Sequence, residues 1–221
     1  MATTPLNGRK AAAQALIDAT VAVAAAGVPL MLRIVPGGDL FRAWDHYPPD
    51  DAVDAASGAR WFYHAHAPGE REAGEHGHFH LFLDPGRLKR RGRRPLAGPP
   101  GGASAGADIV HIAAIGIDLN GLPTRIFTVN RWVTDEWLYR AADITAELVR
   151  FDLAAATGDA LVNRWLTAAV AFFARQIEDV LKLRDAEIAR WAPSADPFED
   201  RRLEVLSSVD IDINSAVTAA G

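Results

Sequence analysis

The chain of 221 residues contains no cysteine and only two methionines. Disulfide bonds, thiolate metal sites, iron–sulfur clusters and cysteine nucleophiles are therefore excluded. A metal site in this protein has to be built from nitrogen and oxygen ligands. Such ligands favour zinc, iron, manganese, nickel or copper(II) and disfavour copper(I).

The sequence also lacks a long apolar run and an excess of basic charge. The alanine-rich stretch from Ala11 to Gly27 is interrupted by Asp18, is too short and alanine-rich for a membrane span, and precedes no clear signal-peptide cleavage site. The formal net charge of -5 disfavours general nucleic-acid binding, which usually uses a basic face. We therefore expect a cytoplasmic protein without membrane or nucleic-acid partners, and the oligomeric state is left open.

Hydrophobic periodicity predicts helices near both ends of the chain and strands between them. One alanine-rich helix is expected over residues 9–26, and a long helix over residues 159–191, where apolar residues recur at three- and four-residue steps. Aromatic and β-branched runs predict strands at residues 60–67, 76–83, 109–117 and 125–133. This segregation predicts one α+β domain over residues 1–221, with a central antiparallel sheet of about four strands covered by the N- and C-terminal helices.

The remaining segments carry weaker signals. Residues 30–35 fit a strand or a helix, residues 45–58 are rich in proline and aspartate and read as a loop, and residues 209–213 fit a short edge strand. Residues 85–107 combine a basic run at 87–94 with many glycines and prolines, which predicts a flexible surface loop. The basic run suits a phosphate-bearing ligand, although a solvated loop is the favoured interpretation.

Histidines are concentrated in one short stretch. Five of the seven lie within it: His64, His66, His76, His78 and His80. Because side chains alternate between faces along a strand, the first two share a face and the last three share a face. A core would use valine or leucine there without burying polar rings, so the pattern indicates a functional site.

A hairpin would bring these histidines together. We expect His66 opposite His78 and His64 opposite His80, with opposed Cβ atoms about 4.5–5.5 Å apart. Two imidazoles at that separation reach one metal ion through bonds of about 2.0–2.1 Å. Adjacent buried imidazoles stay mainly neutral, which is the form that binds metal.

The expected ligands are ranked by this geometry. His64, His66, His78 and His80 come first, followed by His76. His46 lies in the aspartate-rich loop and is expected to close over the site. Glu75 is the candidate catalytic residue as a general base, with roles as a metal ligand or as a partner of a ligand left open.

Residues 76–82, HGHFHLF, resemble the histidine-triad motif, His-x-His-x-His followed by apolar residues. The resemblance implies a nucleotide hydrolase or transferase that needs no metal, with His78 or His80 attacking phosphorus. Gly77 departs from the family, which usually has a bulky apolar residue at that position.

Residues 58–77 resemble the first cupin motif, through Gly58, His64, His66, Glu70 and Gly77. In a cupin, the two histidines and the glutamate would be metal ligands. The second cupin motif is missing, and the long helical C-terminal half is atypical. The resemblance therefore favours metal binding more than it favours the cupin fold.

A broader resemblance covers most of the chain. The segments HYPPDD, YHAH, EHGHFHLF and FTVNRWVTDEW are similar to those of a family of uncharacterised bacterial proteins with no assigned activity. This resemblance groups the residues around the two histidine segments into one site and implies no particular reaction.

Arg131, near the end of the last predicted strand, is a candidate for holding an anionic substrate. The favoured alternative is an ion pair with Asp135, Glu136 or another neighbour.

Together these features predict a histidine-ligated divalent transition metal (zinc, iron, manganese, nickel or copper) in an enzyme that activates water or oxygen. The substrate would be a small-molecule or phosphate-bearing ligand. Two alternatives stay open: a metal-free histidine-triad-like nucleotide phosphohydrolase or transferase, and a non-catalytic metal storage, delivery or sensor protein.

Overall fold

The protein is built around an open antiparallel sheet of six strands that follow one another in chain order, β1 to β6. The computed structural model describes residues 6–35, 41–99, 108–191 and 196–220. The strands are β1 (Tyr47–Val53), β2 (Ala59–His64), β3 (Gly77–Leu83), β4 (Val110–Ile117), β5 (Pro123–Val129) and β6 (Val205–Asp210). Every connection joins neighbouring strands, so the two edges of the sheet are β1 and β6.

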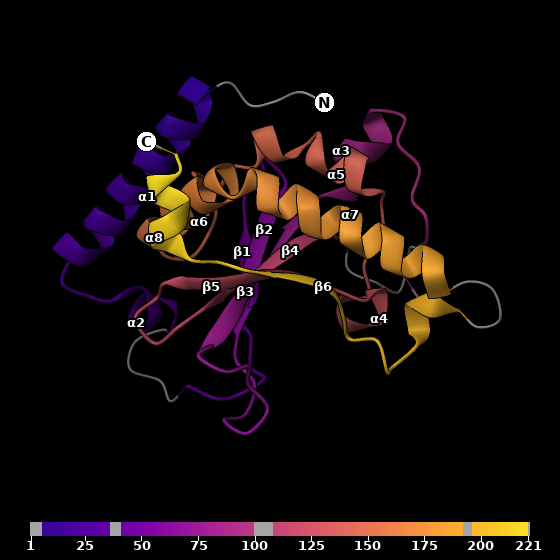
Figure 1. Cartoon of the computed structure of the whole chain (residues 1–221), viewed down its shortest axis with the longest axis horizontal. Helices are drawn as coiled ribbons and strands as arrows, with labels where there is room; N and C mark the ends of the chain where they lie inside the picture. The colour runs from indigo at the N-terminus through magenta and orange to yellow at the C-terminus, as the bar shows by residue number, and fades with distance from the viewer. Residues whose placement is uncertain (1–5, 36–40, 100–107, 192–195, 221) are drawn as a thin grey trace.

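The described helices are α1 (Leu6–Ala25), α2 (Leu30–Ile34), α3 (Pro85–Arg90), α4 (Arg131–Thr134), α5 (Ala141–Thr145), α6 (Ala160–Phe172), α7 (Ala174–Trp191) and α8 (Ile213–Thr218), with 3-10 turns at Leu148–Arg150 and Pro197–Glu199. The long helices α1, α6 and α7, from the two ends of the chain, cover one face of the sheet (Figure 1). The α+β architecture with terminal helices packed on an antiparallel sheet is confirmed. None of the described helices combines the length and apolarity needed to cross a membrane.

Strand alternation separates two kinds of side chain. On the covered face, Trp61, Tyr63, Phe79 and Leu81 are at most 1% exposed and join one core with the apolar residues of α1, α6 and α7. The indole nitrogen of Trp61 donates to Oδ1 of Asn163 on α6 at 2.8 Å, which ties the sheet to that helix. The intervening residues face the other way and carry the histidines.

The expected long helix over residues 159–191 is two helices. Asp159 caps α6 by accepting from the backbone amides of Leu161 and Val162, as an N-cap residue does. Phe173 then leaves helical geometry, with φ -89° and ψ 12°, and α7 begins at Ala174 in a new direction. The fully buried Phe173 joins the core at this bend.

Two strands were not among the four expected. Residues 45–58, expected as a loop, contain β1, because an edge strand tolerates the missing amides of Pro48 and Pro49. β6 begins four residues before the short strand expected at 209–213. Residues 30–35 form the helix α2 rather than a strand.

The segment expected as a flexible loop, residues 85–107, is partly ordered. Pro85 to Arg90 form α3, whose first turn is capped by the side chain of Asp84 accepting from the amide of Gly86. Ala97 forms an isolated antiparallel bridge with Leu138. Residues 100–107 of this segment lie outside the described residues.

The expected hairpin of β2 and β3 is present, but its register is shifted. His64 lies opposite His78, and Phe62 lies opposite His80, whereas the spacing predicted His66 opposite His78. β2 ends at His64, and the carbonyl of the next residue, Ala65, accepts from the amide of Trp44 on the β1 side. A shift of two residues leaves each side chain on its expected face, since the side-chain period of a strand is two.

Candidate metal centre

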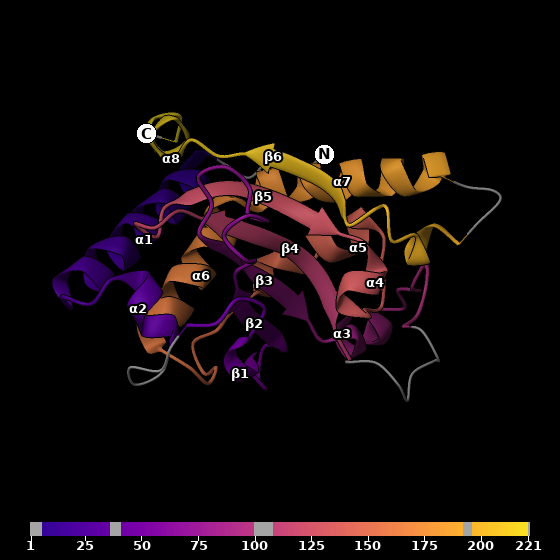
Figure 2. The ribbon, with the colours of Figure 1, turned by 90° about the horizontal axis from the view of Figure 1, so that it is seen from below.

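The sheet face turned away from the helices carries a continuous group of aromatic rings, which we call the histidine face. Its members are Phe62, His64, His78, His80, Phe82, His111 and Phe127. In Figure 2 the helices α6 and α7 lie behind the sheet, and the connection between β2 and β3 crosses in front of it. The histidines are thus carried by β2, β3 and β4, and the connection between β2 and β3 passes over the face that they share.

Three of these histidines form a group that could hold a metal ion. Each of His64, His78 and His80 offers one ring nitrogen, and the three nitrogens lie within 4.8 Å of one another. The three residues are 8%, 3% and 1% exposed, so the group is buried. The register explains the proximity, because His64 and His78 face each other across the hairpin and His80 follows on the same face.

A carboxylate fixes the orientation of His78. Oε1 of Glu75 lies 2.7 Å from Nδ1 of His78, and Oε2 of Glu75 accepts from Nε of Arg125 at 2.6 Å. Burial alone would raise the pKa of Glu75, but the hydrogen bonds from His78 and Arg125 outweigh it and lower that pKa. Glu75 is therefore ionised at neutral pH, and Nδ1 of His78 must carry the proton that it accepts.

This hydrogen bond decides which nitrogen of His78 is free. With the proton on Nδ1, the neutral ring has an unprotonated Nε2, which is the atom that faces Nε2 of His64 at 2.7 Å. Without an ion, His64 donates its Nε2 proton across this contact. With an ion bound by both nitrogens at about 2.0–2.1 Å in tetrahedral geometry, they would separate to about 3.3 Å, and the neutral His64 ring would carry its proton on Nδ1 instead of Nε2.

The third histidine has its own partner, which sequence reasoning did not assign to the site. Nδ1 of His80 lies 3.1 Å from Nε2 of His111 on β4. The backbone amide of His111 donates to Oε2 of the fully buried Glu136 at 2.6 Å, which holds this part of β4 in place. His111 is 31 residues from His80, and only the pairing of β3 with β4 makes them neighbours.

Comparison with known proteins identifies the family and no activity. The sequence model of a family described as a domain of unknown function, DUF6969, matches residues 10–211. The chain belongs to the DUF6969 family. No curated protein sequence and no solved structure matches it. The chemistry of this DUF6969 protein therefore has to be argued from its own residues.

Burial keeps the buried histidines of the DUF6969 protein, His64, His78, His80 and His111, neutral. Burial, followed by the charges of His78, His66 and His46, lowers the pKa of His64 to about 2. Burial likewise places the pKa of His80 well below its ordinary value, and lowers that of His111 to about 3. Burial also lowers the pKa of His78, against the opposing effect of Glu75. Neutral imidazole is the form that coordinates a metal.

Two glycines make room for this arrangement. A Cβ atom on Gly116, which lies opposite His78 in β4, would come within 2.5 Å of Oε2 of Glu75. A Cβ atom on Gly77 would come within 2.5 Å of the backbone oxygen of His64 and closer still to the hydroxyl of Tyr63. The glycine that departs from the histidine-triad pattern is thus required by the close packing of β2 against β3.

Two further histidines lie at the outer side of the group. The half-buried ring of His66 is centred 5.3 Å from His64 and 5.2 Å from His78, and it stacks on Trp44 at 4.2 Å. His46 stacks on Phe62 at 3.7 Å, with its ring centre 5.8 Å from His64 and its side chain 45% exposed. His46 and His66 thus lie between the buried group and solvent.

The structure does not bring His76 to the group. Its Nδ1 lies 2.6 Å from the hydroxyl of Tyr63, which belongs to the helix-covered face, and its ring packs near Phe41. The backbone amide of His76 bonds to the carbonyl of Ile117, one residue before β3 begins, so strand alternation does not extend to it.

Arg131 is also elsewhere. It is ion-paired with Glu199 at 2.6 Å and donates to the carbonyl of Gly98 at 2.6 Å, and its guanidinium lies over the ring of Phe198. An ion pair with Asp135, Glu136 or another neighbour was the favoured interpretation, and the pair forms with Glu199 rather than with the two residues named. None of its contacts belongs to the histidine face.

The basic run at 87–94 is largely engaged with the protein itself. Arg91 pairs with Glu147 at 2.9 Å and Arg93 with Asp143 at 3.2 Å. The ammonium of Lys89 lies 4.0 Å from the ring centre of Trp137. These three residues of the run therefore already have partners within the protein.

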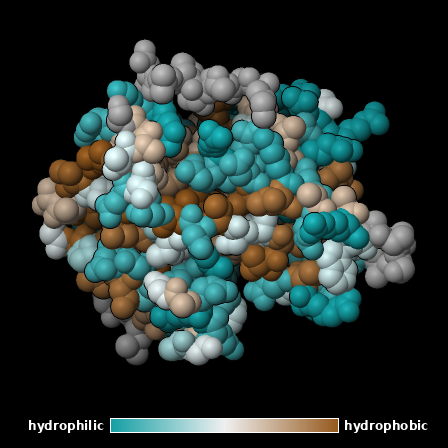
Figure 3. Space-filling view, viewed as in Figure 1, coloured by the Kyte–Doolittle hydropathy of each residue, from teal (hydrophilic) through white to brown (hydrophobic). Residues whose placement is uncertain are grey.

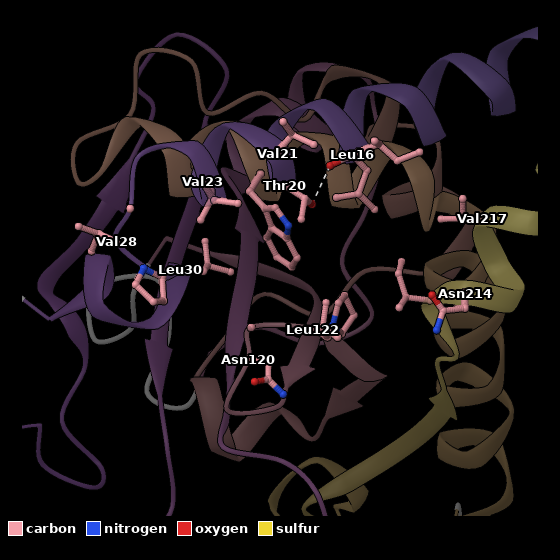
Figure 4. Close-up of a pocket in the computed structure, with 18 residues that line it drawn as sticks. Leu16, Thr20, Val21, Val23, Val28, Leu30, Asn120, Leu122, Asn214 and Val217 are labelled. Carbon is pink, nitrogen blue, oxygen red and sulfur yellow. Dashed lines mark hydrogen bonds between the residues drawn. The ribbon is translucent and has the colours of Figure 1, made fainter.

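A large apolar hollow shares no residue with the histidine face and lacks the chemistry of a catalytic centre. It measures about 550 Å³ between α1, α8 and the turn from β4 to β5. Figure 4 shows Leu16, Val21 and Val23 of α1 on one side and Leu122 on the other. Its lining holds no titratable side chain, whereas the histidine face is dense with them.

Proposed function

We propose that this DUF6969 protein binds one divalent transition metal ion through His64, His78 and His80, and that the ion serves catalysis. The observation that carries the proposal is the convergence of three neutral, buried ring nitrogens within 4.8 Å of one another. Three protein ligands leave one position of a tetrahedral ion open, which distinguishes catalytic from structural zinc sites.

The donor set favours some ions over others. Three imidazoles without a carboxylate suit zinc, copper, nickel or iron better than manganese or magnesium, which prefer oxygen ligands. Zinc is our first candidate, because sets of three histidines are established catalytic zinc ligands. When bound, such an ion lowers the pKa of a coordinated water to about 7 and so supplies a nucleophile at neutral pH.

The surrounding residues have positioning roles in this proposal. Glu75 contacts the Nδ1 side of His78, away from the nitrogen that would meet the ion, so it fixes the tautomer and does not act as a general base. His111 does the same for His80 by accepting from Nδ1. His66 is half-buried beside His64 and His78, so it is better placed than the fully buried His111 for exchanging protons with solvent.

Two observations favour metal binding over a histidine-triad-like phosphate enzyme. His76, the first histidine of that motif, is turned to Tyr63 and does not join His78 and His80. The nearby basic residues Arg91 and Arg93 are paired with Glu147 and Asp143. Histidines that face each other across two strands can reach one metal ion, which supports the metal-binding proposal.

One observation supports a second candidate, a storage or sensor protein. His66 lies close enough to the group that a side-chain rotation would supply a fourth nitrogen and close the site. X-ray absorption spectroscopy of the zinc-loaded protein separates the two candidates. We expect the outer-shell scattering of the imidazole rings to fit three histidine ligands, whereas four would indicate the closed, non-catalytic site.

Elemental analysis of untagged protein, purified without added metal, tests the proposal. We expect one ion per chain, and loss of that ion in the His64→Ala/His78→Ala double variant. His76→Ala is the matched control and should keep the ion, because its ring lies outside the group. Circular dichroism shows whether the variants fold. A folded wild type that takes up no ion after reconstitution with zinc, iron, manganese, nickel and copper overturns the proposal.

A further inference from the structure

β6 leaves one edge of the sheet open. It pairs with β5 on one side, and on its other side no strand of the described residues pairs with it. An unpaired strand edge presents a row of backbone donors and acceptors that can accept another strand.

The opposite edge of the sheet carries more protection than β6, whose one register break lies near its start, between Val205 and Ser207. β1 carries Pro48 and Pro49, its register breaks between Tyr47 and Ala52, and Asp51 has a positive φ of 54°. Proline and irregular backbone are devices that prevent strand addition. β6 (VLSSVD) has no proline or lysine, and Figure 3 shows a band of hydrophobic surface along it.

The backbone groups that face outward can be identified from the ladder. The amide of Ile211 donates to the carbonyl of Thr124, so this pair is hydrogen-bonded. Antiparallel pairs alternate between hydrogen-bonded and non-bonded. Val209 lies two residues from Ile211 and pairs with Ile126, so this pair is hydrogen-bonded as well. Ser208 and Asp210 fall on the non-bonded positions, so their amides and carbonyls point to the open edge.

An acidic cleft lies beside this edge on the histidine face. It measures about 340 Å³, and Ser208, Asp210, Glu72 and Glu75 are among the residues that line it. Its one basic lining residue, Arg125, is already paired with Glu75 at 2.6 Å and lies 3.7 Å from Glu72. The cleft therefore keeps an excess of negative charge that complements a cation.

We propose that the open edge of β6 binds an extended segment of a partner protein, which adds as a seventh strand and places a lysine or arginine side chain in the acidic cleft. The faces of β6 define the pattern of that segment. Ser208 and Asp210 lie on the histidine face, while Val209 lies on the helix-covered face and packs with the core. A segment that alternates basic and apolar residues matches both faces.

A second copy of the chain fits this edge less well. Antiparallel pairing of two β6 strands places their twofold axis perpendicular to the sheet, so both acidic clefts would lie on the same face beside each other. Like charges would then meet across the interface, which opposes such a dimer.

A pair of capped six-residue peptides tests the proposal, one alternating lysine and valine and the other alternating glutamate and valine. We expect calorimetry at low salt to show binding of the lysine peptide only. Ser208→Pro removes an outward amide without removing a hydrogen bond to β5, so it should weaken binding at least about tenfold. Ser208→Ala keeps the amide and is the control that should bind as wild type does.

The outcomes distinguish the alternatives. Asp210→Lys provides a second test that leaves the backbone unchanged, and it should also abolish binding of the lysine peptide. Equal binding of the two peptides, or unchanged binding by folded Ser208→Pro, overturns the proposal. A wild-type dimer in sedimentation that Ser208→Pro dissociates would instead show that the edge pairs with a second copy.

Discussion

Oε1 of Glu75 and Nδ1 of His78 lie 2.7 Å apart, and the same carboxylate accepts from Arg125 through its other oxygen. A charged group from β5 is thereby connected, through one side chain, to a candidate metal ligand on β3. The connection crosses β4 at Gly116, where any larger residue would collide with the carboxylate. As a consequence, the proton of His78 stays on Nδ1, which leaves Nε2 free to bind a metal ion.

Replacing Glu75 by glutamine should therefore weaken zinc binding. The neutral amide no longer holds the proton on Nδ1 of His78, and loss of such a partner typically lowers metal affinity about 10–100-fold. Competition with a chromophoric chelator measures the change. Glu70→Gln, which alters an exposed carboxylate of the same loop, should bind zinc as the wild type does. Equal affinities of the two variants would show that Glu75 does not position the ligand.

The sequence alone predicted which side chains share a face of the hairpin, but it did not predict which residues pair across it. Parity decides the face, so the alternation of His64, His78 and His80 with core aromatics predicted a shared face without knowledge of the pairing. Alternation leaves the register open, because pairing His64 with His78 or with His80 puts the same side chains on the same face. The spacing of the histidines therefore carries no signal that separates the two pairings.

The residues that the sequence did not assign to the site lie far from the histidine cluster along the chain. His111 and Arg125 reach the histidine face only through the pairing of β3 with β4 and of β4 with β5. His76 was grouped with His78 by spacing alone, yet it precedes the strand and turns to Tyr63. Gly116, in the middle of an apolar strand, was the available signal, because an interior glycine often marks a close approach.

Glu136 provides a pH dependence that does not involve the candidate ligands. Burial raises its pKa to about 8, from 4.5 in the unfolded chain, and one of its oxygens has no hydrogen-bond partner. Between about pH 4.5 and 8, Glu136 is therefore protonated in the folded protein and ionised in the unfolded chain. This contribution to stability is fully present below pH 4.5 and is lost as the pH rises towards 8.

The variant Glu136→Gln removes this dependence, because an amide does not titrate. Relative to the variant, the wild type should lose about 1.4 kcal/mol of unfolding free energy per pH unit between about pH 5 and 7.5. Urea unfolding of both proteins at several pH values gives the difference. A difference that does not change with pH would mean that Glu136 ionises normally in the folded protein.

Asn163 should be essential for docking α6 onto the sheet. Its Oδ1 accepts from the indole of Trp61, and its Nδ2 donates to the carbonyls of Ala156 and Thr157. Asn163→Ala leaves these buried groups unpaired and should cost about 2–4 kcal/mol in unfolding free energy. Asn214→Ala, at an exposed position, should change it by no more than about 0.5 kcal/mol. Similar urea midpoints for the two variants would contradict the assigned role.

The route by which an ion or substrate reaches the buried histidines should pass Trp44. This half-exposed indole stacks on His66 at 4.2 Å and lies 6.0 Å from His64, at the side of the group where His46 is also exposed. Trp44→Ala removes the stack and opens that side. We therefore expect a chelator to extract zinc several-fold faster from this variant, while the equilibrium affinity changes little because no ligand is altered.

Stopped-flow mixing with a chromophoric chelator measures the extraction rate, and competition at equilibrium measures the affinity. Trp191→Ala is the matched control, since that indole is also partly exposed and contacts Glu187 and Arg202, outside the histidine face. Extraction rates that stay equal in both variants would place the route elsewhere. A large loss of affinity in Trp44→Ala would instead show that the indole holds the ligand set in shape, through His66 and His64.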